Sequence, residues 1–182
     1  MNTQEVAVKT KWGVDATHSE VQFKVKHLVI STVTGFFRKF SGAVETTSED
    51  FDGAKVNFSI ETNSIDTNVA DRDAHLKSPD FFAADQYPAI EFKNGTLKKV
   101  SGDEYKLAGD LTIRNVTKPI ELSVEYNGTV ADPWGNTRAG FEVKGSVNRK
   151  DYNLSWSAIT EAGKIVVGDD VKLLLNIEVV RS

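Results

Sequence analysis

The sequence lacks cysteine altogether and holds few histidines. A 182-residue chain without thiols forms no disulfide, no thiolate zinc site and no cysteine nucleophile, while its redox compartment stays open. The three histidines, His18, His27 and His75, lie far apart, and no His-x-x-x-His or His-Glu pair occurs. This spacing argues against a metal site. Catalytic signatures are also absent, because there is no Gly-x-Ser-x-Gly elbow, Walker loop or Rossmann glycine pattern.

Long apolar runs and an excess of one charge are missing too. No window approaches the apolar length of a membrane span, and Met1 to Lys11 lacks the continuous apolar core of a secretory signal. The chain as written is therefore predicted to be cytoplasmic, or periplasmic if a leader has been removed. With 22 basic and 26 acidic residues mixed along the chain, the net charge is −4. We expect no nucleic-acid partner and no stable membrane insertion.

The chain does contain many segments in which every second residue is apolar. This period is typical of strands with one buried face. It occurs from Val21 to His27, Val56 to Ile60, Tyr105 to Ile113, Ile120 to Tyr126, Phe141 to Val147 and Val171 to Val179. With the segments 36–44 and 90–97 the count is roughly eight strands. Turn residues separate them at Asn94-Gly95, Ser101-Gly102, Asn127-Gly128, Asp132 to Asn136 and Val167 to Asp169.

Two segments depart from this pattern. Between Thr34 and Glu45, Phe36 and Phe40 share one phase and Phe37 has the other, which predicts a bulge. Only Asn68 to Leu76 and Arg149 to Trp156 resemble short helices, so no helical layer can cover the strands. The sheet must cover itself as a barrel or a sandwich. Ten Phe, four Tyr and three Trp could fill the interior or line a cavity, and on composition alone the filled core is the commoner outcome.

Charged residues cluster at Asp71, Arg72, Asp73 and His75. Two carboxylates, a guanidinium and an imidazole within five positions suit an acid–base site or an anion clamp. The same residues also suit a solvated helical turn held by an Arg–Asp pair, which is the more frequent outcome. His27 continues the apolar phase of Val25, which places its imidazole inside the barrel or at its rim.

The chain resembles the YceI family of lipocalin-like bacterial polyisoprenoid-binding proteins over roughly Trp12 to Val180. The resemblance rests on blocks of residues that occur in one order: Trp12 to Asp15, His18-Ser19, Val21 to Leu28, Thr34 to Phe37, Phe40 to Gly42, Arg72 to Phe82, Tyr87 to Phe92, Gly109 to Ile113, Thr117 to Ile120, Gly140-Phe141 and Asn148 to Tyr152. Arg114-Asn115-Val116 departs from the His-Gly type turn usual in the family, and Asn153 replaces a common glycine.

The resemblance implies an all-β fold, an extended antiparallel eight-stranded lipocalin-like barrel with one or two short helical segments. We expect one domain over residues 1–182, with 1–11 as a peripheral N-terminal segment. The implied partner is an amphiphilic isoprenoid lipid, such as a polyisoprenoid quinone or a prenyl phosphate, held in an apolar tunnel, often by a homodimer. Exposed apolar positions such as Val29, Ile30, Leu174 and Val180 could pair subunits. Neither a cofactor nor a catalytic residue is implied.

With the resemblance in view, the alternation assigns a set of residues to the lipid tail. They are Phe23, Val25, Phe36, Phe40, Phe58, Ile60, Leu76, Phe81, Phe82, Phe92, Leu111, Ile113 and Trp156. The head group is predicted to meet Arg72 and His75, assisted by His18, His27 and Lys77.

Three function classes therefore compete. Carrying or sequestering a lipid leads. The alternatives are an enzyme that acts on an isoprenoid through Asp71 to His75, and a stress-related interaction protein without a ligand. A filled core, in which Phe58 and Leu111 contact each other rather than open space, would favour the last class.

Overall fold

The computed structural model describes residues 9–48, 50–158 and 166–182. Within these residues the elements are β1 (Thr10–Val14), η1 (Ala16–His18), β2 (Glu20–His27), β3 (Ser31–Phe37), β4 (Phe40–Thr46), β5 (Lys55–Glu61), η2 (Thr62–Ser64), β6 (Ile65–Asp66), α1 (Ala70–Lys77), β7 (Ala89–Ser101), β8 (Glu104–Ile113), β9 (Val116–Ala131), β10 (Thr137–Asn148), η3 (Arg149–Tyr152) and β11 (Val167–Arg181). Among them, no helix has the length and apolar character needed to cross a membrane.

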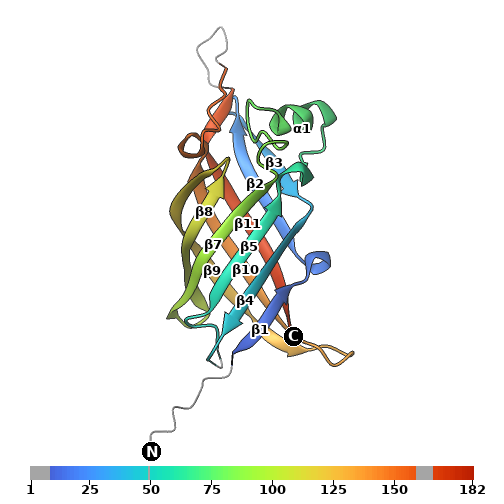
Figure 1. The fold of residues 1–182 in the computed structure, drawn as a ribbon, viewed down its shortest axis with the longest axis vertical. Helices are drawn as coiled ribbons and strands as arrows, with labels where there is room; N and C mark the ends of the chain where they lie inside the picture. Colours follow the sequence, from blue (N-terminus) through green and yellow to red (C-terminus); the bar gives the residue numbers. More distant parts are fainter. Residues whose placement is uncertain (1–8, 49, 159–165) are drawn as a thin grey trace, which may run out of the picture.

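The strands form one antiparallel sheet that closes on itself (Figure 1). Closure occurs where β1 pairs with β11, with Gly13 opposite Val180. The barrel has eight long strands, as predicted, although the described residues form eleven separate ones. The first three long strands are each interrupted and consist of two shorter strands. The first consists of β1 and β2, which both pair with β11. The second consists of β4, which pairs with β1, and β3, which pairs with β2. The third consists of β5, which pairs with β4, and β6, which pairs with β3.

The prediction of a bulge between residues 34 and 45 is wrong, because one of these interruptions lies there instead. The chain instead leaves β3 at Phe37 and starts β4 at Phe40, so the phase of β4 does not continue into β3. Backbone bonds hold the break, since Arg38 N–H donates to the Ser64 carbonyl and Glu61 N–H donates to the Lys39 carbonyl. As a result Phe37 is buried and Phe36 lies on the opposite face of β3.

Glycine-containing pairs play two roles along the strands. Ser101-Gly102 and Asp132 to Asn136 connect strands, as predicted, whereas Asn94-Gly95 lies inside β7, where the register shifts. Asn127-Gly128 likewise lies inside β9, opposite a register shift in β10. These pairs are bulges rather than turns. The hairpin of β8 and β9 has the two-residue loop Arg114-Asn115, whose φ angles of 49° and 62° fit a type I′ turn.

The N-terminal boundary also needs correction. Thr10 and Lys11, which we had expected in a peripheral segment, already pair with Thr46 and Glu45 of β4. The rest of that expected segment, up to residue 8, lies outside the described residues.

The barrel end that carries α1 is called the upper end, and the end that carries the C-terminus the lower end (Figure 1). Two apolar clusters fill the core. The lower one includes Trp12, Phe51 and Phe141, and the upper one includes Phe23, Phe81 and Tyr152. Phe81 and Tyr152 belong to segments that follow α1 and β10, so the upper core is covered by connecting segments as well as by strands.

These covering segments are tied together by one arginine. Nη1 of Arg114, at the β8–β9 turn, donates to the carbonyls of Pro79, Phe81 and Asn153 at 3.0, 2.7 and 3.1 Å. The turn therefore fixes both the chain after α1 and the chain after η3.

Candidate functional site

The interior of the barrel contains an apolar cavity of about 220 Å³. Its walls come from the inward-facing residues of nearly every strand, together with α1 and the chain that follows it. The two core clusters meet there, because Phe58, Leu111 and Leu173 pack against both. Phe58 and Leu111 line the cavity instead of only filling a core.

Several phenylalanine rings on the inner wall of the barrel lie over glycines of a neighbouring strand. A Cβ added at Gly35 would come within 2.2 Å of the Phe23 ring, and one at Gly109 within 2.5 Å of the Phe92 ring. Gly42 is covered by Phe58 in the same way. Because these glycines have no side chain, the rings can lie in space that a side chain would otherwise occupy on the wall.

The predicted tail residues divide into two groups. Ten of them line the cavity: Phe23, Val25, Phe58, Ile60, Leu76, Phe81, Phe82, Phe92, Leu111 and Ile113. Three are not among the lining residues. Phe40 stacks on Phe58 with ring centroids 5.7 Å apart, and Trp156 packs against Phe81 at 5.4 Å.

The third residue, Phe36, lies on the face of β3 that points away from the cavity, contrary to the prediction. Its ring packs beneath the Arg38 guanidinium, 4.4 Å from the centroid, and Phe37 lines the cavity in its place. The reason is the break between β3 and β4, which separates Phe36 from the phase of Phe40.

The predicted head-group residues do not converge on one site. Arg72 donates from Nε and Nη2 to the Thr67 hydroxyl and carbonyl, both at 2.7 Å, and Asp73 accepts from the Thr67 amide at 2.8 Å. These bonds hold the start of α1. His75 bonds Asp80 at 2.8 Å and packs edge-on against Trp156, 4.9 Å away.

The remaining head-group candidates lie on other elements. Lys77 ends α1, and His27 ends β2, half-buried and outside the cavity lining. His18 lies in η1, where its Nδ1 is 2.8 Å from Asp15 Oδ2. The structure therefore places Arg72, His75 and Lys77 on one helix, α1, and His18 and His27 on other elements, η1 and β2.

A site residue that the sequence analysis missed is Arg149, the one charged side chain among the described residues that line the cavity. It is only 3% exposed. Its guanidinium donates to the carbonyls of Gly168, Leu154 and Trp156 at 2.8, 2.5 and 2.7 Å, and lies 3.6 Å from Asp169. Burial lowers the pKa of Arg149, and the Asp169 charge partly opposes this shift. The signal was present in the sequence, because Arg149 continues the inward phase of Phe141, Val143 and Val147.

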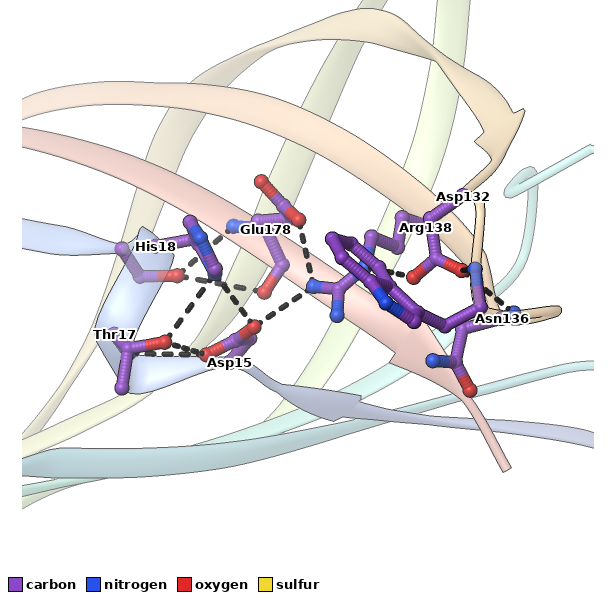
Figure 2. Close-up of polar contacts among 9 residues, drawn as sticks. Asp15, Thr17, His18, Asp132, Asn136, Arg138 and Glu178 are labelled. Carbon is purple, nitrogen blue, oxygen red and sulfur yellow. Dashed lines mark hydrogen bonds and ion pairs between the residues drawn. The ribbon is translucent and has the colours of Figure 1, made fainter.

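A separate polar cluster lies toward the lower end, where Arg138 bridges three carboxylates (Figure 2). Its Nη1 is 2.8 Å from both Asp15 and Glu178, and its Nε is 2.7 Å from Asp132. Hydrogen bonds, chiefly from Thr17, His18 and Arg138, lower the pKa of Asp15, and Arg138 lowers that of Asp132 to about 2. Atoms of Asp15, His18 and Glu178 lie within 4.8 Å of one another, as metal ligands would. Because the Arg138 guanidinium already bonds the carboxylates of Asp15 and Glu178, the cluster is an ion-pair network.

The fold and the cavity together define a lipocalin-like barrel with an apolar interior. A family model described as the YceI-like domain matches residues 12–179, and the chain belongs to this family. The UPF0312 protein of Pectobacterium atrosepticum is 38% identical over 177 residues, which cover 97% of this chain and 88% of that protein. Protein YceI of Salmonella newport is 37% identical with 97% and 89% coverage.

Solved structures share the fold. The YCEI protein of Campylobacter jejuni is 34% identical with a TM-score of 0.67, and the match covers 85% of this chain and 88% of that one. BcnA of Burkholderia cenocepacia is 21% identical with a TM-score of 0.77, covering 91% and 98%. A structure described as a polyisoprenoid binding domain, from Saccharophagus degradans, is 17% identical with a TM-score of 0.64, covering 92% and 97%.

Proposed function

We propose that this protein binds an amphiphilic isoprenoid lipid, a polyisoprenoid quinone or a prenyl phosphate, and carries or sequesters it with the tail in the barrel cavity. The observation that carries the proposal is the apolar cavity itself, enclosed by the inward faces of the strands. The Saccharophagus relative described as a polyisoprenoid binding domain has the same fold, which supports this class of ligand.

An isoprenoid tail offers little besides apolar area, so its affinity would come from burial at roughly 25 cal/mol per Å². The cavity of about 220 Å³ is smaller than the roughly 300–1,000 Å³ of pockets for drug-sized ligands. A tail of several isoprene units would therefore enter as Leu and Phe side chains move aside. Half-buried lining residues such as Leu111 and Leu173 would move most easily.

The head group is proposed to remain at the upper end. Arg149 supplies a buried positive charge in the wall there, and it packs within the same segment as Tyr152 and Leu154 of the upper cluster. His75 and Lys77 lie on α1, whose Leu76 also lines the cavity. These groups would favour a phosphate or a quinone oxygen over an uncharged hydrocarbon end.

We propose binding rather than turnover because the clustered charges of α1 have structural partners. Arg72 and Asp73 are both bonded to Thr67, and His75 to Asp80. Asp71, the remaining member of the cluster, is exposed, and none of the four residues is among those that line the cavity. The ligand-free alternative is disfavoured because Phe58 and Leu111 line open space.

Charging the cavity wall tests the proposal. Phe58→Asp and Leu111→Asp should abolish co-purification of lipid, because an aspartate would have to be desolvated beside the tail. Ser123→Asp is the matched control: Ser123 is exposed beside the inward-facing Leu122, and its strand partners are Lys106 and Lys144. Equal lipid content in all three variants would refute the assignment of the cavity.

A second variant guards against unfolding. Leu111→Trp fills the cavity with apolar volume instead of charge, so the barrel should keep its structure while lipid occupancy falls. Lipid extraction with mass spectrometry gives occupancy, and circular dichroism reports the fold. Full occupancy in a folded Leu111→Trp protein would place the ligand elsewhere.

A further inference from the structure

The hairpin of β2 and β3 has an apolar tip that the fold does not bury. Val29 is 68% exposed and Ile30 is 78% exposed. Leu28 and Val29 have φ angles of 52° and 66°, in the left-handed region where Asn and Gly are usual and a β-branched residue is an outlier. The chain thus keeps apolar side chains at a position where polar ones would fit the backbone better.

The charge of this hairpin is opposite to that of the whole chain. The hairpin, residues 20–37, carries the basic Lys24 and Lys26 against a single carboxylate, Glu20 at its start, whereas the net charge of the protein is −4. Lys24 and Lys26 are exposed and make no ion pair with any residue that the structure describes. Lys24 also lies directly opposite Lys172 of β11, an unfavourable like-charge pair. On the strands that pair with the hairpin, the acidic groups toward the tip are Asp169, which pairs with Arg149 and Lys150, Asp170 in the bulge of β11, and Asp66, which pairs with Arg38. Helix α1 at the same end of the barrel adds Asp71 and Asp73.

The tip lies at the upper end of the barrel, the end that carries α1 (Figure 1). His27, the last residue before the tip, is opposite Val167, and Val167 lines the cavity. Val25, two residues further down β2, lines it as well. A surface that held this tip would therefore lie beside the upper end of the cavity.

We propose that the β2–β3 tip docks on an anionic lipid bilayer, with Val29 and Ile30 inserted at the interface and Lys24 and Lys26 facing the head groups. Exposed apolar side chains next to unpaired lysines are the combination that interfacial binding requires. The purpose of docking rests on the proposed function, because a lipid tail would then pass between bilayer and cavity. Docking itself can be measured whether or not the cavity holds a lipid.

The competing surface is the β9–β10 hairpin, where Trp134 is 81% exposed and Val130 64% exposed. It lies at the opposite end of the barrel (Figure 1). Its apolar side chains stand beside Asp132, and the strand that leads to it carries Glu121 and Glu125. Because Asp132 is paired with Arg138, the segment 130–138 holds no unpaired basic side chain that would attract an anionic surface, so the two ends can be distinguished.

The absence of cysteine makes a direct test straightforward. Ile30→Cys and Trp134→Cys each offer a single site for a polarity-sensitive fluorophore. On vesicles of phosphatidylcholine containing phosphatidylglycerol, the label at position 30 should shift to the blue and the label at position 134 should not. A shift at position 134 alone, or none at either position, would overturn the proposal.

Vesicle flotation supplies the quantitative test. Val29→Asn with Ile30→Thr should lower partitioning at least about tenfold, and each of Lys24→Gln and Lys26→Gln about fivefold. Pure phosphatidylcholine vesicles should bind the unmodified protein weakly. Unchanged partitioning of the Val29→Asn/Ile30→Thr variant would contradict the proposal. So would a dimer of the unmodified protein in analytical ultracentrifugation that the variant does not form, because the tip would then contact a second copy of the chain.

Lipid uptake from detergent separates this proposal from the function proposed above. If the cavity binds lipid and the tip docks, the Val29→Asn/Ile30→Thr variant takes up prenyl phosphate from detergent normally but slowly from vesicles. Vesicle binding without uptake in either assay would refute the cavity function alone. Uptake from detergent without vesicle binding would refute docking alone.

Discussion

Arg149 is a buried cation in a wall that is otherwise largely apolar. Its bonds to the carbonyls of Gly168, Leu154 and Trp156 join β11 to the chain that follows η3. Because these carbonyls are shielded from water, they need a donor. The side chain thus holds the cover of the upper end in place and also brings positive charge to the cavity.

We expect Arg149→Ala to destabilise the protein by about 3–5 kcal/mol, the usual cost of removing one member of a buried polar network. Urea unfolding measures this. Lys150→Gln is the control, since Lys150 also contacts Asp169 but its side chain is 46% exposed, and it should cost less than about 1 kcal/mol. Equal losses in the two variants would show that the carbonyl bonds of Arg149 matter little.

At the hairpin tip, Val29→Asn should stabilise the fold. A left-handed conformation costs an L-residue about 1–2 kcal/mol, and Asn tolerates it better than Val. An increase of about 0.5–1 kcal/mol in the free energy of unfolding is therefore expected, with Val100→Asn, at an exposed strand position, as the comparison. A loss of stability in Val29→Asn would mean that Val29 packs against something in the folded protein.

The direction in which a strand residue faces is predictable from alternation only where the strand is continuous. Alternation identified Phe23, Phe58 and Leu111 as inward-facing, because their strands run without interruption around them. It misassigned Phe36, since the break at Arg38-Lys39 depends on backbone bonds to residues more than twenty positions away. Contacts at that sequence separation leave no local pattern.

Among the elements, the alternation of apolar residues predicts roughly eight strands and two short helical segments, whereas the choice of a barrel over a sandwich comes from the family resemblance. The sequence did not predict that the first three strands are each interrupted, nor that Asn94-Gly95 is a bulge. A glycine pair has the same local signature in a turn and in a bulge, and only pairing with the neighbouring strand distinguishes them. The charged cluster of α1 likewise suits either an anion clamp or a capped helical turn, and only the contacts of Thr67 with Arg72 and Asp73 distinguish the two.

The contacts between aromatic rings and glycines join neighbouring strands, since Phe23 lies in β2 and Gly35 in β3. Gly35→Ala would place a Cβ 2.2 Å from the Phe23 ring and push that ring from the wall. We expect a loss of about 1–3 kcal/mol from overpacking, together with reduced lipid occupancy. Gly13→Ala is the control, since a Cβ there meets nothing within 4 Å. Normal stability and occupancy in Gly35→Ala would show that the ring has other space.

At the scale of the whole molecule, Arg138 joins β10 to β11, to the β9–β10 turn and to the residue that precedes η1 (Figure 2). Its carboxylate partners Asp15 and Asp132 have lowered pKa values in the folded state. Unfolded aspartates titrate near pH 3.9. The stability that these groups contribute is therefore complete above about pH 4 and is lost as the pH falls toward about 2.

We expect Arg138→Gln to lower the free energy of unfolding at neutral pH. On acidification, the variant should then lose less of its remaining stability than the unmodified protein loses. Unfolding in urea at several pH values measures both effects. Asp50 and Asp66 also have lowered pKa values, so the difference between variant and unmodified protein reports the Arg138 network. Lys144→Gln, which removes an exposed pair with Glu142, should leave the pH profile unchanged. Parallel profiles for Arg138→Gln and the unmodified protein would contradict the role of Arg138.

The apolar cavity is the feature on which the functional account depends. Native mass spectrometry of the purified protein, followed by solvent extraction and identification of bound molecules, tests it most directly. The account predicts one isoprenoid or comparable long-chain amphiphile per chain, present on purification or acquired after incubation with quinones or prenyl phosphates. A mass that remains that of the bare chain after both treatments would contradict it.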